Sequence, residues 1–347
     1  MMNKIVVCTD SFKGSLSAQE ATKIIANEIR KIMPVTKVIE LPLADGGEGT
    51  AQILYKRFYP TIINVKAHDP LGRTIKSRYY LDNSGTKAFI ESAEIIGLPL
   101  LKTEERNPLK TSSVGLGEII KKAIENGCKE ITVSLGGSAT CDGGQGMLEA
   151  LNKTYKGIKF KIICDVNNPL LGENGAVKIF APQKGAKKED LPILEEKLHQ
   201  FVEQSVVKGY CKKEDAFKQG AGAAGGLGFA FMTYLNGELI KGIEYILNSL
   251  KFREIIKNAD IIITGEGKID KQSLMGKVIS GVLKECLIQN KDLIAISGSL
   301  EDKELLLKAG IKDIYSIANP NLTIEENMDR QIAKYNLKRT VNSIFSK

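Results

Sequence analysis

The sequence predicts an α/β fold: a doubly wound, mainly parallel sheet domain with a second, mixed α/β domain inserted into it. Near both ends of the chain, short β-branched runs alternate with helical segments, as in strand–helix–strand units whose strands run parallel. In the middle of the chain, turn signals separate alternating apolar and polar runs and predict antiparallel hairpins. Polar, mostly glycine-rich clusters also follow five of the expected strands directly.

The first strand–helix–strand unit is predicted close to the N-terminus. The apolar runs KIVVC (4–8) and KVIEL (37–41) indicate strands. Between them, residues 17–33 carry apolar side chains at helical spacing. A serine ahead of this run, Ser15 or Ser17, with Glu20 in the first turn predicts a capped start for the helix.

The segment 62–92 contains the turn signals DPLGR and DNSG, which predict antiparallel hairpins. Strands are also predicted at 130–135 and 158–164. We therefore place an inserted mixed α/β domain at 63–234. The remaining residues, 1–62 and 235–347, form one discontinuous Rossmann-like domain in this prediction.

The alternating pattern returns in the C-terminal part of the chain. It predicts a strand at 260–264, a helix from about Lys277, a strand at 293–297, a helix near 301–309 and a strand at 313–318. The sequence shows no repeat of fixed period.

Composition restricts the classes of function. The chain has 43% hydrophobic and 26% charged residues, as globular proteins do, and we expect it to be cytoplasmic because it has no signal-peptide core and no apolar run of 18 residues. The formal charge is +8, but the lysines are spread along the chain and often stand beside Glu, which disfavours nucleic acid as a partner. The six cysteines form no C-x-x-C pair, which disfavours structural zinc.

The five clusters that follow strands are the candidate site. They read TDSFKGS, ADGGEGT, GGSATCDGG, DVNNPLLG and GEGKID. In open α/β sheets, ligands bind beyond the carboxyl ends of the strands, where the N-termini of helices also point. The clusters therefore predict a cleft lined by backbone N–H groups and carboxylates, which suits a phosphorylated ligand and its metal.

Two common nucleotide fingerprints do not explain the chain. It contains no G-x-x-x-x-G-K-[ST] sequence, and GAGAAG (220–225) matches G-x-G-x-x-G without the preceding strand that a dinucleotide site needs. A tight turn into the helix that follows is the simpler interpretation, and a nicotinamide-dependent dehydrogenase remains an alternative. Cysteine-nucleophile chemistry is disfavoured, because the two histidines, His68 and His199, stand in no catalytic signature.

Several charged residues in the clusters have both a structural and a functional interpretation. Lys13 lies near a helix N-terminus, where a cation is unfavourable unless an anion binds. Asp45 and Glu48 either complement a helix dipole or serve a metal or a substrate hydroxyl. Asp142 could cap the helix that follows it, and Lys268 lies in what could be a solvated loop or a phosphate contact.

Taken together, the motifs resemble the bacterial type-1 glycerate kinase family. The blocks DSFKGSLSA, PLADGGEGT, ERNPLKTSSVGLGE, GGSATCDGGQGM, CDVNNPLLG, PQKGA, GAGAAGGLG and TGEGKIDKQSLMGKV occur in the order that is typical of that family. They span roughly residues 5 to 300. The sequence departs from the family pattern at Cys141, where an asparagine is usual.

This resemblance implies a two-domain enzyme that transfers the γ-phosphate of ATP to D-glycerate with Mg²⁺. The product would be 2-phosphoglycerate or 3-phosphoglycerate. We expect small-molecule partners only, D-glycerate and ATP, with no nucleic acid and no membrane, and with a homodimer as one candidate assembly. The alternatives are a kinase for another small hydroxy acid or sugar acid and a non-catalytic anion-binding or nucleic-acid-binding protein.

The chemistry of phosphoryl transfer then suggests a role for each group of residues. We expect Asp45 to orient or deprotonate the attacking hydroxyl, and Lys13 and Lys268 to neutralise phosphoryl charge. Asp165 and Asp270 are the predicted Mg²⁺ ligands. The predicted substrate-binding and phosphate-binding residues are Asp10, Ser11, Gly46, Gly47, Glu48, Gly136, Gly137, Ser138, Asp142, Gly143, Gly144, Gly265 and Glu266. For the carboxylate of glycerate, Arg73, Arg106 and the hydroxyl run 111–113 remain open.

Overall fold

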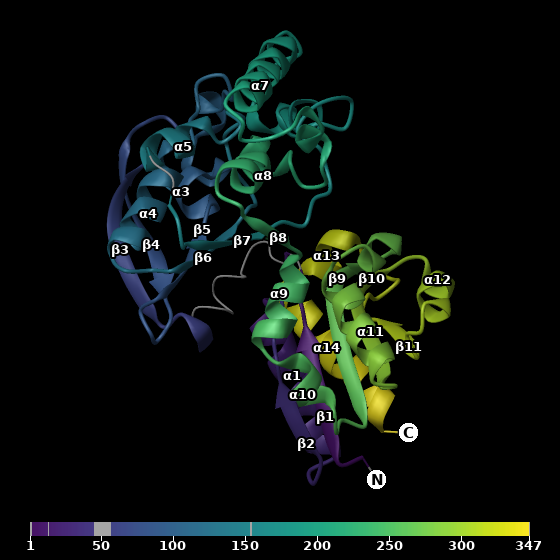
Figure 1. The fold of residues 1–347 in the computed structure, drawn as a ribbon. Coiled ribbons are helices and arrows are strands. Elements are labelled where there is room, and N and C mark those ends of the chain that lie inside the picture. Colours follow the sequence, from purple (N-terminus) through teal and green to yellow (C-terminus); the bar gives the residue numbers. More distant parts are fainter. Residues whose placement is uncertain (1, 13, 45–56, 153–154, 347) are drawn as a thin grey trace. The chain divides into compact units, whose positions relative to one another are not determined.

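The structure, a computed structural model, describes residues 2–12, 14–44, 57–152 and 155–346. The chain forms two compact units (Figure 1): unit 1 comprises residues 1–53 and 243–347, and unit 2 comprises residues 54–242. The sequence-based division at residues 62 and 234 stays a prediction for the boundaries of the functional domains. No helix in the described ranges combines the length and the apolar character that crossing a membrane requires.

Unit 1 is built on a five-stranded sheet in the order β11-β10-β9-β1-β2, and every neighbouring pair runs parallel. In register, Thr9 of β1 lies beside Gly265 of β9, and Glu266 lies beside Ser297 of β10. The strands are β1 (Lys4–Thr9), β2 (Lys37–Glu40), β9 (Ile261–Ile269), β10 (Asp292–Leu300) and β11 (Asp313–Ser316).

Helices cover both faces of this sheet, as a doubly wound fold requires. Ile5 and Val7 of β1 and Ile263 of β9 pack in one core cluster with residues of α1 and α14. Val6 and Ile262 are equally buried and point to the opposite face, because alternate side chains of a strand face opposite ways. On that face α11 contacts β9 and β10. The helices are α1 (Ala18–Ile32), α9 (Gly242–Ser249), α10 (Phe252–Ile256), α11 (Val278–Ile288), α12 (Lys303–Lys308), α13 (Ile324–Met328) and α14 (Arg330–Phe345).

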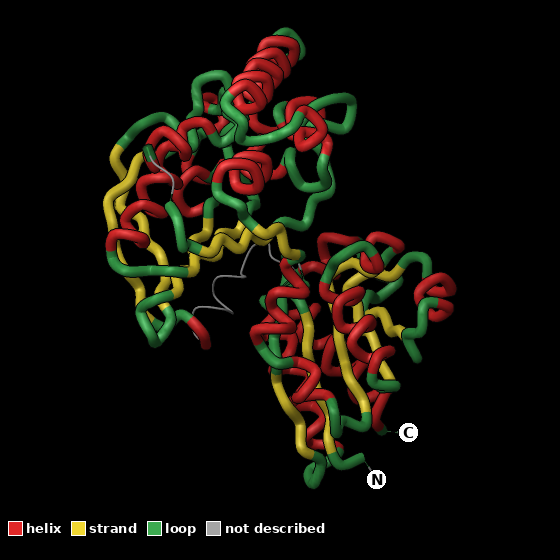
Figure 2. The backbone as a smooth tube through the Cα atoms, in the orientation of Figure 1, coloured by secondary structure: helices red, strands yellow, loops and turns green. Residues whose placement is uncertain are grey.

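Unit 2 contains a six-stranded mixed sheet in the order β3-β4-β5-β6-β7-β8. The pairs β3–β4 and β4–β5 are antiparallel, which confirms the hairpins predicted for 62–92, and the remaining pairs are parallel. Figure 2 shows the long β3–β4 hairpin at one edge of this sheet. The strands are β3 (Thr61–His68), β4 (Thr74–Leu81), β5 (Lys87–Glu91), β6 (Glu130–Ser134), β7 (Lys159–Ile163) and β8 (Glu238–Ile240).

The helices of unit 2 bury two apolar clusters. The larger one joins β5, β6 and β7 to α4, α5 and α8 and contains Ile90, Val133, Leu116, Met147 and Phe231. The smaller one gathers around α7. The helices are α3 (Ala93–Ile96), α4 (Val114–Glu125), α5 (Gln145–Leu151), α6 (Ala176–Phe180), α7 (Asp190–Val207) and α8 (Ala223–Tyr234).

The predicted fold class is confirmed, and one local expectation is wrong. The sequence suggested that the strand after residue 260 ends at 264, but β9 continues to Ile269 and pairs with β10 as far as Leu300. Glycine allows this close pairing, because a Cβ at Gly265 would lie 2.3 Å from the carbonyl oxygen of Ile296, and one at Gly298 would lie 2.3 Å from that of Gly267. The segment GEGKI is therefore strand, not loop.

The backbone of the GAGAAG segment packs closely against other residues of unit 2. Three successive residues, Ala224, Gly225 and Gly226, adopt left-handed backbone angles where α8 begins. A Cβ at Gly225 would lie 2.0 Å from the carbonyl oxygen of Thr140, and one at Gly226 would lie 2.6 Å from the Cα of Gly143. The segment thus packs its backbone directly on the glycine-rich residues that follow β6, as the sequence-based interpretation as a tight turn allowed.

This packing predicts a stability difference between two glycines that share the same backbone strain. Gly225 (φ +73°) has no room for a methyl group, whereas a Cβ at Gly209 (φ +75°) would meet nothing within 4 Å. Gly209→Ala should destabilise unit 2 by about 1 kcal/mol, and Gly225→Ala by about 3 kcal/mol or more. Urea unfolding followed by circular dichroism measures both, and equal losses would refute the packing argument.

Candidate active site

In unit 1, three polar side chains lie at the carboxyl ends of three neighbouring strands. Asp10 follows β1, Glu266 lies in β9 and Ser297 lies in β10, and all three are buried. The N–H of Asp10 donates to the carbonyl oxygen of Gly265 at 2.8 Å, which continues the strand pairing to this point. The structure therefore brings together the predicted residues Asp10, Gly265 and Glu266 near the carboxyl ends of the strands.

Glu266 is tied to the short 3₁₀ helix Lys271–Leu274 that follows β9. The hydroxyl of Ser273 donates to its carboxylate, and the N–H of Asp270 donates to the same hydroxyl oxygen at 3.2 Å. Oδ1 of Asp270 in turn accepts the N–H of Gln272 at 2.8 Å, so this carboxylate caps the 3₁₀ helix. Ser297 differs, because its buried hydroxyl has no partner among the described residues.

Lys268 lies near the carboxyl end of β9, between two carboxylates. Its Nζ is 2.9 Å from Oε1 of Glu301 and 3.6 Å from Oδ2 of Asp270, and the side chain is half exposed. The hydrogen bond to Glu301 raises the pKa of Lys268, so the ammonium stays charged. Any phosphoryl oxygen that binds this lysine has to compete with both acids.

The N-terminal loop is described only in part. The N–H of Ser11 donates to Oδ1 of Asp10 at 2.6 Å, and the carbonyl oxygen of Ser11 accepts the N–H of Gly267 at 3.2 Å. Ser17 caps α1 through a reciprocal pair of hydrogen bonds with Glu20, as the sequence suggested. Five predicted site residues lie outside the described residues: Lys13, Asp45, Gly46, Gly47 and Glu48.

In unit 2, Asp142 fixes the segment between β6 and α5. Its Oδ2 accepts the N–H of Ser113 at 2.8 Å, the hydroxyl of Ser113 at 2.7 Å and the N–H of Gly146 at 3.2 Å. Its Oδ1 accepts the N–H of Gly144 at 3.0 Å. Asp142 therefore holds the first turn of α5 against the start of α4, which agrees with the capping interpretation.

The glycines of this segment fall into two groups, and we call residues 135–144 the glycine loop. The N–H of Gly143 donates to the carbonyl oxygen of Gly225 at 3.0 Å, and that of Gly144 donates to Asp142. By contrast, the N–H groups of Gly136, Gly137 and Ser138 meet no acceptor anywhere in the described part of the chain. Successive free N–H groups of this kind form a concavity that binds anions, and Gly137 is left-handed (φ +62°), as such a turn requires.

A buried lysine that the sequence analysis did not single out lies against the glycine loop. Lys184 is 3% exposed, and its Nζ donates to Oγ of Ser138 at 2.9 Å and to the carbonyl oxygen of Thr140 at 2.7 Å. Desolvation lowers its pKa, which nearby Cys141 and Asp142 partly counteract. PQKGA was one of the motif blocks, but nothing in that block distinguishes a buried lysine from the many surface lysines of the chain.

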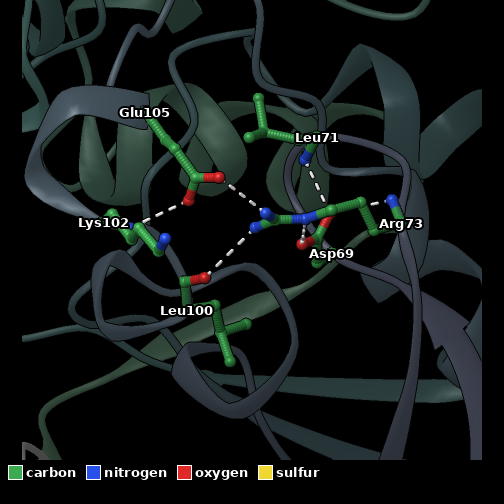
Figure 3. A network of polar contacts seen from close by, with 6 residues as sticks. All are labelled: Asp69, Leu71, Arg73, Leu100, Lys102 and Glu105. Atoms are coloured by element: carbon green, nitrogen blue, oxygen red, sulfur yellow. Dashed lines mark hydrogen bonds and ion pairs between the residues drawn. The ribbon is translucent and has the colours of Figure 1, made fainter.

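The two arginines considered for a substrate carboxylate differ sharply. Each of the three guanidinium nitrogens of Arg73 donates a hydrogen bond (Figure 3): Nε to Asp69 at 2.6 Å, Nη1 to Glu105 at 2.7 Å and Nη2 to the carbonyl oxygen of Leu100 at 3.3 Å. The guanidinium of Arg106 makes no hydrogen bond or ion pair with any described residue, and its Nε is buried. Arg106 is therefore the one of the two that is available to a ligand.

The two predicted metal ligands lie in different units. Asp165 follows β7 in unit 2 and accepts the N–H of Gly242 at 2.8 Å, and Asp270 lies in unit 1. No cluster of three or more His, Cys, Asp or Glu side chains suited to a metal occurs among the described residues. Magnesium that arrives with nucleotide phosphates needs only one or two carboxylates, so single aspartates at strand ends still fit that ion.

Comparison with known proteins gives the family. The family model described as "Glycerate kinase family" matches residues 5–155 and 149–347. A protein named glycerate kinase from Halalkalibacterium halodurans is 36% identical, over 95% of this chain and 94% of its own. A protein named glycerate 2-kinase from Escherichia coli is also 36% identical, over 93% and 92%. The chain belongs to the glycerate kinase family.

A solved structure extends this similarity to the fold. A Salmonella typhimurium protein, provisionally described as glycerate kinase 2, is 33% identical and superposes with a TM-score of 0.84 over 100% of this chain and 98% of its own. The α/β architecture with one parallel and one mixed sheet is therefore that of a glycerate kinase relative over the full length of the chain.

Cys141, where the sequence departs from the family pattern, is an apolar packing residue in this family member. It lies in the smaller core cluster with Leu198 and Phe201 of α7, and it is 2% exposed. Burial raises the pKa of its thiol to about 11, so the thiolate is scarce at neutral pH. This environment agrees with the expectation that the enzyme uses no cysteine nucleophile.

Proposed function

We propose that the protein is a glycerate kinase of the bacterial type-1 branch, which transfers the γ-phosphoryl group of ATP to a hydroxyl of D-glycerate. The observation that carries the proposal is the 36% identity to proteins named glycerate kinase and glycerate 2-kinase over more than nine-tenths of both chains. The name of the Escherichia coli relative favours the 2-hydroxyl as acceptor and hence 2-phosphoglycerate, with 3-phosphoglycerate as the alternative product.

Phosphoryl transfer asks the protein chiefly for positioning and for neutralisation of charge. We assign the backbone donors Gly136, Gly137 and Ser138 to oxygens of the substrates, because these N–H groups have no other acceptor among the described residues. Lys13 and Lys268 are assigned to phosphoryl charge, and Asp45 to the proton of the attacking hydroxyl.

When bound, magnesium would neutralise the phosphate oxygens, and Asp165 of unit 2 and Asp270 of unit 1 are its candidate ligands in this proposal, each considered within its own unit. Each already has Oδ1 fixed by one backbone N–H, of Gly242 and Gln272 respectively. Such a bond orients a carboxylate before a ligand arrives, which reduces the entropy lost on binding.

A coupled ATP assay with D-glycerate tests the proposal, with the position of the phosphate in the product assigned by NMR. Turnover with D-glycerate and phosphate on the 2-hydroxyl is the expected result. A panel of other small hydroxy acids and sugar acids tests the nearest alternative, and a faster rate with one of them would replace glycerate as the substrate. Absence of ATP turnover with the whole panel would refute the kinase assignment.

The proposed base gives a second prediction. Asp45→Asn should lower kcat by about 100-fold or more, because an amide cannot take the proton of the hydroxyl, and should leave both KM values nearly unchanged. Glu48→Gln is the matched control, since it removes another carboxylate of the same ADGGEGT segment and should act mainly on KM. Equal kcat for wild type and Asp45→Asn would remove Asp45 from catalysis.

The contrast between the two arginines gives a third prediction. We assign the carboxylate of glycerate to Arg106, so Arg106→Gln should raise KM for D-glycerate about 10-fold or more. Arg73→Gln leaves the buried carboxylate of Asp69 without its cation, and should lower the melting temperature while KM changes little. Steady-state kinetics and thermal unfolding of both variants separate the roles, and the reverse assignment of effects would identify Arg73 as the ligand.

A further inference from the structure

Lys184 is a buried lysine that has no counter-ion among the residues that the structure describes. None of the ion pairs among the described residues includes it, although its side chain is almost completely withdrawn from water. Asp142, the carboxylate whose charge acts on it, directs its oxygens to Ser113, Gly144 and Gly146 instead. Burying a charge in this way is strongly unfavourable unless another charge compensates it.

The hydrogen bonds of Lys184 show where that compensation can come from. Both hydrogen bonds of Nζ go to the glycine loop, one to Oγ of Ser138 and one to the carbonyl oxygen of Thr140. The amino group is therefore bonded to the same segment as the three N–H groups of Gly136, Gly137 and Ser138, which have no acceptor among the described residues. The buried hydroxyl of Thr140 also has no partner there.

The glycine at position 136 has no structural reason to be glycine. A Cβ at Gly136 would meet nothing within 4 Å, and its φ lies outside the left-handed region. Packing and backbone strain, which explain Gly143 and Gly144, therefore do not explain Gly136. A side chain at this exposed position would instead obstruct the approach of a ligand to the free N–H groups.

We propose that Gly136, Gly137 and Ser138 bind an oxyanion of the substrates, a carboxylate or a phosphoryl group, and that Lys184 supplies its countercharge from beneath the loop. Lys184 is a positioning residue in this proposal: it holds Ser138 and Thr140 and stabilises the bound anion through the low-dielectric interior, where charges act strongly. The identity of the bound anion rests on the proposed function, whereas the anion site itself does not.

Anion binding without turnover tests this proposal. Inorganic phosphate and D-glycerate are titrated separately by calorimetry into wild type, Lys184→Met and Lys187→Met at constant ionic strength. Lys187 is the matched control, because it is an exposed lysine of the same segment and its loss changes the net charge equally. We expect at least one of the two anions to bind Lys184→Met 10-fold or more weakly than wild type, and to bind Lys187→Met within about twofold of wild type.

Equal affinity of wild type and Lys184→Met for both anions, or binding of neither anion to wild type, would overturn the proposal. If Lys184→Met does not fold, Ser138→Ala carries the test, since it removes one of the two links to the ammonium and leaves the lysine in place. A threefold or greater loss of affinity in Ser138→Ala then supports the proposal, and no loss overturns it.

The two anions also separate this proposal from the proposed function. Phosphate binding that depends on Lys184 in a protein that does not phosphorylate D-glycerate would uphold the anion site and refute the glycerate kinase assignment. Turnover of D-glycerate with anion affinities that are independent of Lys184 would uphold the glycerate kinase assignment and refute the role of Lys184 in the anion site. In active protein, a rise of KM in Lys184→Met that exceeds its fall in kcat would further distinguish a charge effect from general damage to the fold.

Discussion

One carboxylate, that of Asp142, joins two helix starts that are about thirty residues apart in sequence. It accepts two hydrogen bonds from Ser113 at the start of α4 and two from the N–H groups of Gly144 and Gly146 at the start of α5. Hydrogen bonds to a charged acceptor are about twice as strong as neutral ones, so these four bonds stabilise the contact between the two helix starts. Because Asp142 lies within the glycine loop, the geometry of the loop's anion donors depends on this contact.

The two units carry candidate site groups of different chemical kinds. Near the carboxyl ends of its strands, the sheet of unit 1 is acidic. Asp10 and Glu266 are buried there, and Lys268 lies between two further acids. The glycine loop of unit 2 offers backbone N–H donors and a buried ammonium. Carboxylates suit a metal and an attacking hydroxyl, whereas N–H groups and cations suit anionic oxygens, so the two sets are complementary rather than redundant.

Sequence periodicity predicted the fold class because the strands of both sheets appear in the sequence as short apolar or alternating runs. The strands predicted at 4–8 and 130–135 match β1 and β6 within one residue, since a buried parallel strand is a short apolar run. The length of β9 was misjudged, because glycine normally signals a turn, whereas Gly265 here allows close pairing with β10. Local spacing gives no information about a partner strand that is some thirty residues away.

The site was less predictable, because its decisive features are contacts between distant segments. Arg73 and Arg106 are equivalent in the sequence, and only the positions of Asp69, Glu105 and Leu100 show that Arg73 is already engaged. Lys184 could not be recognised from sequence for the same reason: its burial results from Ser138 and Thr140, more than forty residues earlier. Strand-end clusters predicted where polar residues gather, but not which of them keep unused hydrogen-bonding capacity.

The glycine clusters show why composition alone misleads about function. Three of these glycines, Gly143, Gly225 and Gly226, serve one packing contact in which two main-chain segments touch, and Gly144 packs against Leu227 and Ala230 of α8. The N–H groups of Gly143 and Gly144 already have acceptors within the protein, and the role of these two glycines in phosphate binding stays a prediction. Within the glycine loop, Gly136 and Gly137 are exposed, and their N–H groups have no acceptor among the described residues. Gly136 is the clearest case, because neither packing nor a left-handed backbone requires a glycine there, so its main chain stays open to the approach of a ligand.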